Sequence, residues 1–292
     1  MKIAEAASFE QNLNQYDVIY LDITLFLSTL KQSDMLVAQI EQEIIDDLAQ
    51  SYPEIAAEHR LVDSLCKMNQ ITGRKLILII DEWDAMFREC KGADEILDNY
   101  ILLLRSLFKS SLTDQLFAGV YMTGILPIKK YGHESAVSDF YEYSMVEPRP
   151  LQEYIGFTTE EVKSLCQKYD KDYTIMQEWY DGYTVGGVHV YNPKSVMESI
   201  LRDKYSSYWT KTETYEALRN YIDMNFDGLK DTVVDMLGGE KCEVDTGSFQ
   251  NDMTSMKSRD DVLTLLIHLG YLAYDEDTRC VSIPNVEIRE EF

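Results

Sequence analysis

The sequence predicts an α/β protein with a parallel sheet in its first half and a mostly helical second half. Strand-like apolar runs alternate with helical patterns up to about residue 150, which is typical of a doubly wound α/β sheet. Helical patterns continue to Gly270, and two β-rich runs joined by Asp-Glu-Asp-Thr follow them. Because this last pair indicates a hairpin behind a helix, we expect a winged-helix-like module there.

Three apolar runs predict the strands of the sheet. The expected parallel strands are residues 18–23, 76–80 and 116–122. The second run contains three isoleucines and suits a strand that is buried on both faces of a parallel sheet. The third run also resembles a buried strand, and it ends in the polar and flexible pair Thr123 and Gly124.

Helical spacing of apolar residues separates these runs. It extends from about residue 34 to residue 67, with a break where Pro53 suits the start of a new helix. A second amphipathic helix is expected over residues 95–110. In the second half, Thr158 predicts the N-cap of a helix over residues 158–170. Further helices are expected at residues 193–203, 213–223, 228–237 and 260–270.

Three carboxylates follow the second strand directly, at Asp81, Glu82 and Asp84. Ligands of open α/β sheets bind beyond the carboxyl ends of the strands, and acidic residues there commonly hold a divalent cation. In this interpretation Asp81 is directed to Mg²⁺, and Glu82 orients or activates a water. The alternative is an acidic first helical turn, which the helix dipole favours. The pattern alone leaves both open.

Composition excludes several classes of function. The 292 residues suffice for about two domains, and no apolar run is long enough to span a membrane. The net charge of −24 argues against nucleic-acid binding by this chain alone. The five cysteines are scattered without a Cys-x-x-Cys pair, which indicates free thiols in a reducing cytoplasm. His-Glu-x-x-His is absent, so a zinc hydrolase is not expected.

Several motifs together resemble the predicted AAA-ATPase-like family of bacterial proteins. They are LIIDEWDAMFRE, YMTGILPIKKYG, SAVSDFYEYSM, GFTTEEV, WYDGY, VYNPKSV, YWTKT and LIHLGYLAYD with IPNVEI, and they extend along nearly the whole chain. Members have a P-loop ATPase domain followed by a PD-(D/E)XK nuclease-like domain. The resemblance implies an ATPase-like domain over residues 1–150, with its second strand between the other two. It also implies a helical lid and winged-helix-like region over residues 151–292.

The resemblance also implies roles for individual residues. Asp81 and Glu82 correspond to the Walker B pair, which holds Mg²⁺ and acts on water. Thr123 corresponds to the sensor 1 residue that reaches the γ-phosphate of ATP or the attacking water; the alternative is a threonine that bonds its own backbone. Four basic residues near the strand tips are candidates to neutralise phosphate charge, or else are solvated surface charges: Arg88, Arg105, Lys129 and Lys130.

The motif that cradles phosphates is missing. Backbone N–H groups and a lysine hold the β- and γ-phosphates in a P-loop, yet no Gly-Lys-Ser or Gly-Lys-Thr occurs in this chain. The nearest match, Thr-Gly-Arg-Lys at 72–75, directly precedes the second strand. Residues 1–16 resemble the family segment that lies downstream of the loop, so the sheet is expected to be incomplete. The nuclease tripeptide is matched only by Glu161-Val162-Lys163, in a predicted helix.

Three functions therefore compete. The first is an ATPase-like domain, for which ATP and Mg²⁺ are implied cofactors, bound weakly or not at all by this chain alone. The second is a nucleotide-free interaction module, or a truncated remnant of a larger ATPase–nuclease protein. A P-loop-bearing segment or a protein partner would then complete it. The third, a metal-dependent nuclease, is disfavoured by the missing motif and by the charge. The rings of the motif at 179–183 are expected to fill an interdomain core, and those at 208–209 to lie in a core, rather than to stack on an adenine.

Overall fold

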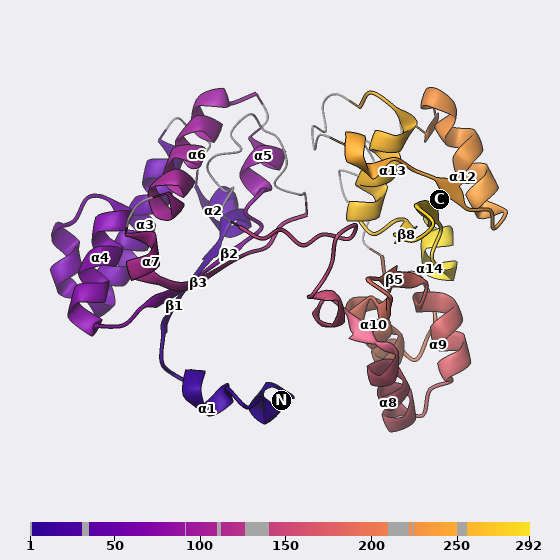
Figure 1. Ribbon diagram of the computed structural model, residues 1–292, viewed down its shortest axis with the longest axis horizontal. Coiled ribbons are helices and arrows are strands. Elements are labelled where there is room, and N and C mark those ends of the chain that lie inside the picture. The colour runs from indigo at the N-terminus through magenta and orange to yellow at the C-terminus, as the bar shows by residue number, and fades with distance from the viewer. Residues whose placement is uncertain are drawn as a thin grey trace. The chain divides into compact units, whose positions relative to one another are not determined.

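Three strands form one parallel sheet in the computed structural model of the protein (Figure 1). They are β1 (Asp17–Asp22), β2 (Leu76–Asp81) and β3 (Phe117–Met122), in the order β1-β2-β3. The predicted strands, their parallel direction and the central place of the second strand are confirmed. The structure describes residues 2–30, 35–90, 92–109, 112–125, 140–209, 222–223, 225–249 and 256–292.

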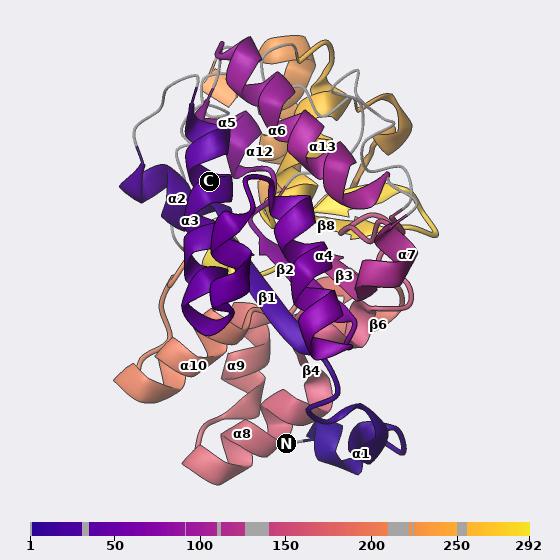
Figure 2. The ribbon, with the colours of Figure 1, turned by 90° about the vertical axis from the view of Figure 1, so that its left-hand side faces the viewer.

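The chain divides into two compact units. The first contains the described residues up to Ile125 together with Phe140, and the second begins at Tyr141. In the first unit, α3 (Leu36–Ser51), α4 (Leu61–Thr72) and α6 (Asp94–Phe108) pack on one side of the sheet (Figures 1 and 2). Its other elements are η1 (Lys2–Glu5), α1 (Phe9–Asn12), α2 (Ile23–Thr29), η2 (Pro53–Ala57), α5 (Ala85–Glu89) and α7 (Thr113–Leu116).

The sheet has one buried face and one open face. Leu76, Leu78 and Ile80 of β2 are buried beneath the helices. On the opposite face Tyr20 is 57% exposed and Tyr121 is 54% exposed. Successive side chains of a strand point to opposite faces, and the helices of the described chain cover one of them. The expectation of strands buried on both faces is therefore wrong for this structure.

The second unit has two small antiparallel sheets. One contains β4 (Phe157–Thr158), β6 (Val188–Tyr191) and β5 (Tyr183–Val185), and the other contains β7 (Cys242–Glu243), β9 (Cys280–Ser282) and β8 (Ala273–Asp275). The described helices are α8 (Thr159–Tyr169), α9 (Tyr173–Tyr180), α10 (Pro193–Arg202), α12 (Leu229–Leu237), α13 (Arg259–His268) and α14 (Val286–Arg289). Short 3₁₀ turns are η3 (Gln152–Tyr154), η4 (Phe226–Gly228) and η5 (Thr246–Ser248).

Several sequence predictions for this unit are confirmed. Thr158 caps α8 in a capping box with Glu161, so the Glu-Val-Lys tripeptide is helical as expected. The expected hairpin is β8 with β9, which pair antiparallel. Most of the predicted helix at 213–223 lies outside the described residues.

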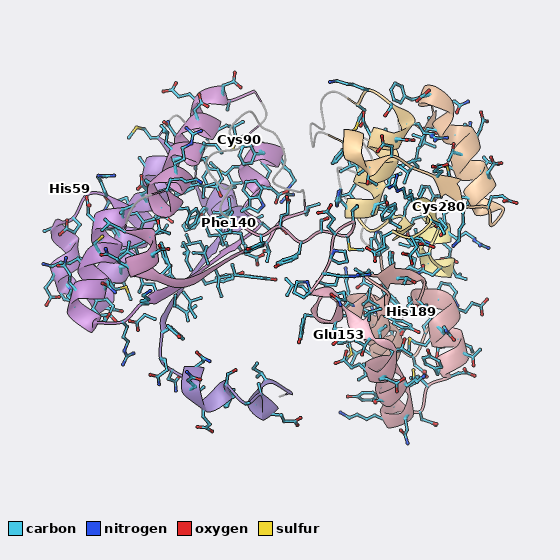
Figure 3. All side chains as sticks on the ribbon, viewed as in Figure 1. His59, Cys90, Phe140, Glu153, His189 and Cys280 are labelled. Carbon is cyan, nitrogen blue, oxygen red and sulfur yellow. The ribbon has the colours of Figure 1, made fainter. Side chains whose placement is uncertain are left out.

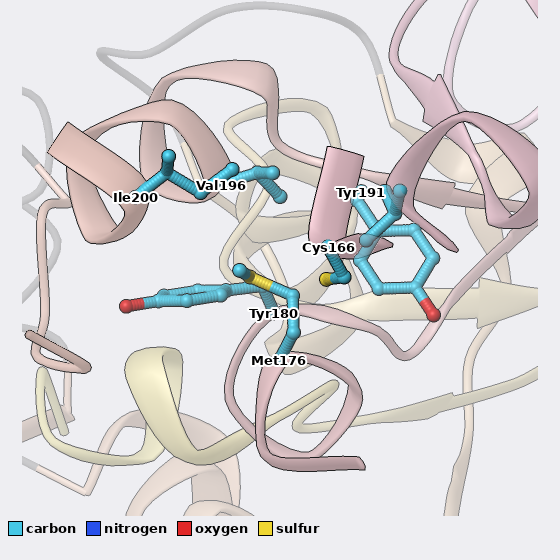
Figure 4. Packing of buried hydrophobic residues seen from close by; sticks show 7 residues of the cluster. Cys166, Met176, Tyr180, Tyr191, Val196 and Ile200 are labelled. Atoms are coloured by element: carbon cyan, nitrogen blue, oxygen red, sulfur yellow. The ribbon is translucent and has the colours of Figure 1, made fainter. Parts of the chain in front are cut away.

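Two tyrosines pack with aliphatic and sulfur-containing side chains in a core of the second unit (Figure 4). Tyr180 of α9 is fully buried beside Met176, Val196 and Cys166. A Cβ on the neighbouring Gly182 would lie 1.9 Å from the carbonyl oxygen of Pro284, at a φ of +111°. Glycine is therefore required where the two segments meet. Tyr180 and Tyr183 of the aromatic motif are buried within the second unit, so their expected place in a core is confirmed, whereas the expected interdomain position stays a prediction.

No helix among the described residues is long and apolar enough to cross a membrane.

Candidate functional site

The carboxyl ends of the three parallel strands meet at one edge of the sheet. Asp22 of β1 pairs in register with Asp81 of β2. The backbone N–H of Thr123, just beyond β3, donates to the carbonyl of Ile80 at 2.9 Å. The structure thus brings Asp81 and Thr123 to the same edge, as the sequence predicts. The left part of Figure 1 shows the strands that lead to this edge.

Asp81 is held by two hydroxyl groups. The Thr123 hydroxyl donates to Oδ1 of Asp81, and the Tyr20 hydroxyl donates to Oδ2 at 2.6 Å. These bonds, from Thr123 first and Tyr20 second, lower the pKa of Asp81, because both stabilise the charged carboxylate. The same bond to Asp81 raises the pKa of Tyr20 to about 12. Asp81 is therefore ionised at neutral pH and accepts a hydrogen bond from each of the two hydroxyl groups.

Asp22 lies beside Asp81 but has a local role. Its Oδ1 accepts the backbone N–H of Leu25 at 3.0 Å and the hydroxyl of Thr24 at 2.6 Å. Asp22 is thus the N-cap of α2, a bond that satisfies one of the free N–H groups at the helix start. Its carboxylate still adds negative charge to the edge at which Asp81 lies.

Glu82 has an unusual backbone conformation. Its φ is +53°, a left-handed region that residues other than glycine rarely adopt. Two backbone bonds surround this turn: Trp83 N–H donates to Thr123 O at 2.9 Å, and Ala85 N–H donates to Glu82 O at 2.9 Å. The turn therefore leads from the strand into α5 while remaining bonded to the tip of β3.

Arg88 connects two of the carboxylates that follow β2. Its Nη2 donates to Oε2 of Glu82, and its Nε donates to Oδ2 of Asp84 at 3.1 Å. The Asp84 side chain is only 1% exposed, and its Oδ1 accepts the N–H of Ile125 at 3.3 Å. Burial raises the pKa of Glu82, and the positive charge of Arg88 opposes that shift. The charge of Arg88 is thus compensated by the protein itself.

Gly124 is required by close packing at the same place. A Cβ on Gly124 would lie 2.6 Å from Oδ1 of Asp84 and 2.7 Å from the Trp83 ring. Real Cβ contacts are not this short, so a larger residue would displace Asp84 or the loop. The Thr-Gly pair of the sequence therefore combines a hydroxyl for Asp81 with the space that Asp84 needs.

The other predicted basic residues are not brought to this edge by the described structure. Arg105 lies in the last turn of α6. The end of that helix packs on the start of β3, where the Phe108 and Phe117 rings are 6.3 Å apart, at the opposite end of the strand from Thr123. Lys129 and Lys130 lie outside the described residues.

The donor atoms at the edge suit a magnesium ion that keeps most of its water. They are carboxylate and hydroxyl oxygens, which Mg²⁺ prefers. Within the described ranges no group of three or more His, Cys, Asp or Glu side chains is arranged to hold a metal. His59 and Cys90 of the first unit, for example, lie apart (Figure 3). All five cysteines are free thiols, in agreement with the sequence prediction. Asp81 therefore fits as one ligand of a hydrated cation.

Sequence reasoning missed Tyr20 and the ion pair between Asp84 and Arg88. Tyr20 contacts Asp81 across 61 positions of the chain, and only the parallel register shows that they are neighbours. Asp84 and Arg88 are four residues apart, a spacing that indicates a helical ion pair. This spacing is visible in the sequence and would have predicted that Arg88 pairs with Asp84.

Comparison with known proteins shows a family resemblance in the first part of the chain. Residues 2–133 match the family model for AAA-ATPase-like proteins, described as predicted AAA-ATPase. The matched segment contains all three strands of the parallel sheet and the edge formed by Asp81 and Thr123. The predicted resemblance is confirmed for these residues, and for the remainder of the chain it stays a prediction. Searches of curated proteins and of solved structures gave no match.

Proposed function

We propose that the first unit supplies part of an ATPase-like nucleotide site, namely the residues that hold the metal ion and those that act on the attacking water. The family match supports the class of protein. The observation that carries the proposal is the hydrogen bond from the Thr123 hydroxyl to the Asp81 carboxylate, at the shared carboxyl edge of adjacent strands. Ligands of open α/β sheets bind beyond this edge.

Each residue at the edge then has a chemical role. Mg²⁺ bound with ATP would neutralise charge on the phosphate oxygens. Asp81 would hold this cation through its water shell, because its lowered pKa keeps it ionised. The Thr123 hydroxyl fixes the orientation of Asp81 and lies where a water or phosphate oxygen would approach. Glu82 would accept a proton from the attacking water once its carboxylate is available.

This chain alone is not expected to hydrolyse ATP. Its sequence contains no Gly-Lys-Ser or Gly-Lys-Thr, so no lysine and no amide cradle of that kind hold the phosphates beside Asp81. Mg²⁺ sheds water reluctantly and normally relies on phosphates to complete its shell. Among the described strands, β3 is paired on one side only, with β2. A phosphate-binding strand and loop from a partner would find a free backbone edge there.

The second unit is interpreted through the same resemblance. Its helices would form a lid region, and α13 with β8 and β9 would form a winged-helix-like module. The antiparallel pairing of β8 and β9 supports the hairpin part of this assignment.

A turnover assay tests the main proposal. The purified chain, incubated with ATP and Mg²⁺, should release no more phosphate than its Asp81→Ala variant. The Glu82→Gln variant should behave in the same way. Mg²⁺-dependent turnover that Glu82→Gln abolishes would contradict the proposed incompetence and would indicate a phosphate-binding loop of another kind.

A nucleotide-free interaction module is the second candidate, and the open face of the sheet favours it. Val18, Tyr20 and Tyr121 are each more than half exposed on that face, although parallel sheets are normally covered on both sides. With a partner in hand, Tyr121→Ser should weaken its binding if the face is the interface. Asp81→Ala should leave that binding unchanged if no nucleotide is involved.

A further inference from the structure

Arg88 bonds both Glu82 and Asp84 directly after β2. We infer that Arg88 is a positioning residue that withholds the Glu82 carboxylate from the cation position beside Asp81. The Glu82 carboxylate bonds Nη2 of Arg88, whereas Asp81 bonds Thr123 and Tyr20. Two carboxylates adjacent in the sequence therefore have separate partners. This inference rests on the proposed function of the edge.

The two ion pairs of Arg88 differ in how easily they break. Asp84 is 1% exposed and Arg88 is 18% exposed, whereas Glu82 is 35% exposed. Separating the buried pair would leave an uncompensated charge away from water, which is costly. Separating the Glu82 pair costs less than separating the Asp84 pair, because the Glu82 carboxylate is about one third exposed and can turn toward water. Arg88 therefore stays on Asp84, and Glu82 is the partner that can leave.

The side chain of Glu82 can leave without movement of the main chain. The backbone on both sides of Glu82 is held by the bonds from Trp83 N–H to Thr123 O and from Ala85 N–H to Glu82 O, both 2.9 Å. The left-handed φ of +53° at Glu82 persists because these contacts fix it. Rotation about side-chain bonds is then the way in which the carboxylate changes its partner.

Asp84, which holds Arg88, is hydrogen-bonded to the loop that follows β3. Asp84 accepts the N–H of Ile125 at 3.3 Å, and Gly124 leaves the space that Asp84 occupies. A displacement of the Thr123 to Ile125 loop would therefore disturb Asp84, and with it the place of Arg88. The hydroxyl that bonds Asp81 and the arginine that holds Glu82 thus depend on the same loop.

A phosphate group is the chemical signal that would release Glu82. The planar guanidinium binds phosphate oxygens in the same forked geometry as carboxylates. A phosphate that bonds the Nη2 side of Arg88 would replace Glu82 while Asp84 keeps Nε. Without phosphate, Asp81 is then the carboxylate available to a cation. Glu82 becomes available only when a phosphate binds Arg88.

Site-specific Mn²⁺ binding, measured by NMR, tests this inference without ATP turnover. Mn²⁺ broadens amide resonances near its site, so the broadening of the Thr123 amide against Mn²⁺ concentration gives an affinity for this position. Four variants are compared with the wild-type chain: Arg88→Gln, Glu82→Gln, their double variant and Arg60→Gln. Arg60 is a matched control because its side chain is 68% exposed in the same unit.

Arg88→Gln is expected to tighten Mn²⁺ binding at Thr123 by about tenfold relative to the wild-type chain, a coupling typical of contacting residues. In the Glu82→Gln background the same change should give a clearly smaller gain. The charge change is −1 in both backgrounds, so the difference between the gains measures the release of Glu82. Arg60→Gln should change the affinity little.

A lysine variant keeps the test decisive if loss of the arginine unfolds the unit. Arg88→Lys preserves the charge, and its single ammonium group should remain on buried Asp84. It should therefore tighten Mn²⁺ binding with no change in net charge. Equal gains in both Glu82 backgrounds, or no gain in either Arg88 variant, would overturn the inference while leaving the metal site intact. No broadening of Thr123 in any chain would overturn the proposed function and this inference together.

Discussion

Exposed tyrosines of the parallel sheet in the first unit contrast with buried tyrosines in the core of the second unit. Tyr20 and Tyr121 are more than half exposed on the open face of the sheet. In the second unit Tyr180 of α9 is fully buried and Tyr191 of β6 is 1% exposed. A strand tyrosine is thus a surface residue in one sheet and a core residue in the other. The elements packed on each face of a sheet decide which, and strand patterns alone do not contain that information.

Hydroxyl groups show the same contrast. The buried Tyr180 hydroxyl donates to the carbonyl of Ser206 at 2.9 Å, and Tyr183 donates to that of Gly270 at 2.6 Å. These bonds satisfy polar groups inside a core. The exposed Tyr20 instead donates to a carboxylate at the sheet edge. Tyr180 and Tyr183 therefore stabilise the core of the second unit, whereas Tyr20 adjusts the charge of a candidate site in the first.

The largest expected effect is in the core of the second unit. Tyr180→Ala removes a fully buried ring and its hydrogen bond, so it should lower the free energy of unfolding by about 3–5 kcal/mol. Tyr154→Ala is the matched control, because Tyr154 is 80% exposed in the same unit, and it should cost no more than about 0.5 kcal/mol. Urea unfolding measures both. Similar losses for the two variants would break the contrast between core and surface tyrosines.

Acid should affect the contributions of Glu287 and Asp81 to stability in opposite directions. Burial raises the pKa of Glu287 in the second unit above its ordinary 4.5, so the folded form favours the protonated acid. As pH falls through that raised pKa, the contribution of Glu287 to the stability of this unit should increase. Hydrogen exchange of the second unit measures this, and Glu287→Gln should remove the gain. A second unit whose pH dependence is unchanged by Glu287→Gln would contradict the expectation.

Asp81 has the reverse sign and gives a sharper test of the edge. Its pKa lies below the ordinary 3.8, with the Thr123 hydroxyl as the first cause. The stabilising contribution of the ionised carboxylate is therefore present above pH 3.8 and is lost as pH falls through the lowered pKa. Thr123→Val should raise the pKa of Asp81, measured by carboxyl ¹³C NMR titration. Thr113→Val, at the other end of β3, is the control that should leave it unchanged.

The smallest expected effect is on the open face. Tyr121→Ser removes an exposed ring, so the free energy of unfolding should change by about 0.5 kcal/mol or less. Binding of an apolar dye to the folded protein should nevertheless decrease, because the ring contributes to the open apolar face. A large loss of stability in this variant would show that the face is covered in solution.

Much of this architecture could be predicted from the sequence, for identifiable reasons. Apolar runs that end in Asp22, Asp81 and Thr123 predict strands and their shared edge, because parallel strands place their carboxyl ends together. Thr158 predicts a helix start because its hydroxyl can accept an N–H of the first turn. These features depend on residues that are close in the chain.

The features that could not be predicted depend on distant contacts or on backbone conformation. The bond from Tyr20 to Asp81 needs the register of two strands. The positive φ of Glu82 arises from contacts with the β3 tip, and glutamate carries no local signal for it. The open face likewise needs the packing of helices on one side, which alternation along a strand does not specify.

The position of a bound cation tests the central claim most directly. Mn²⁺ added to the isotope-labelled chain should first broaden the amide resonances of Asp22, Glu82 and Thr123, at the carboxyl edge of the sheet. Resonances of Asp17 and Leu76 at the opposite edge, and those of the second unit, should broaden only at higher concentration. Asp81→Asn should abolish the selective effect. Broadening spread evenly over the acidic surface, or strongest in the second unit, would contradict the assignment of this edge as the metal side of an ATPase-like site.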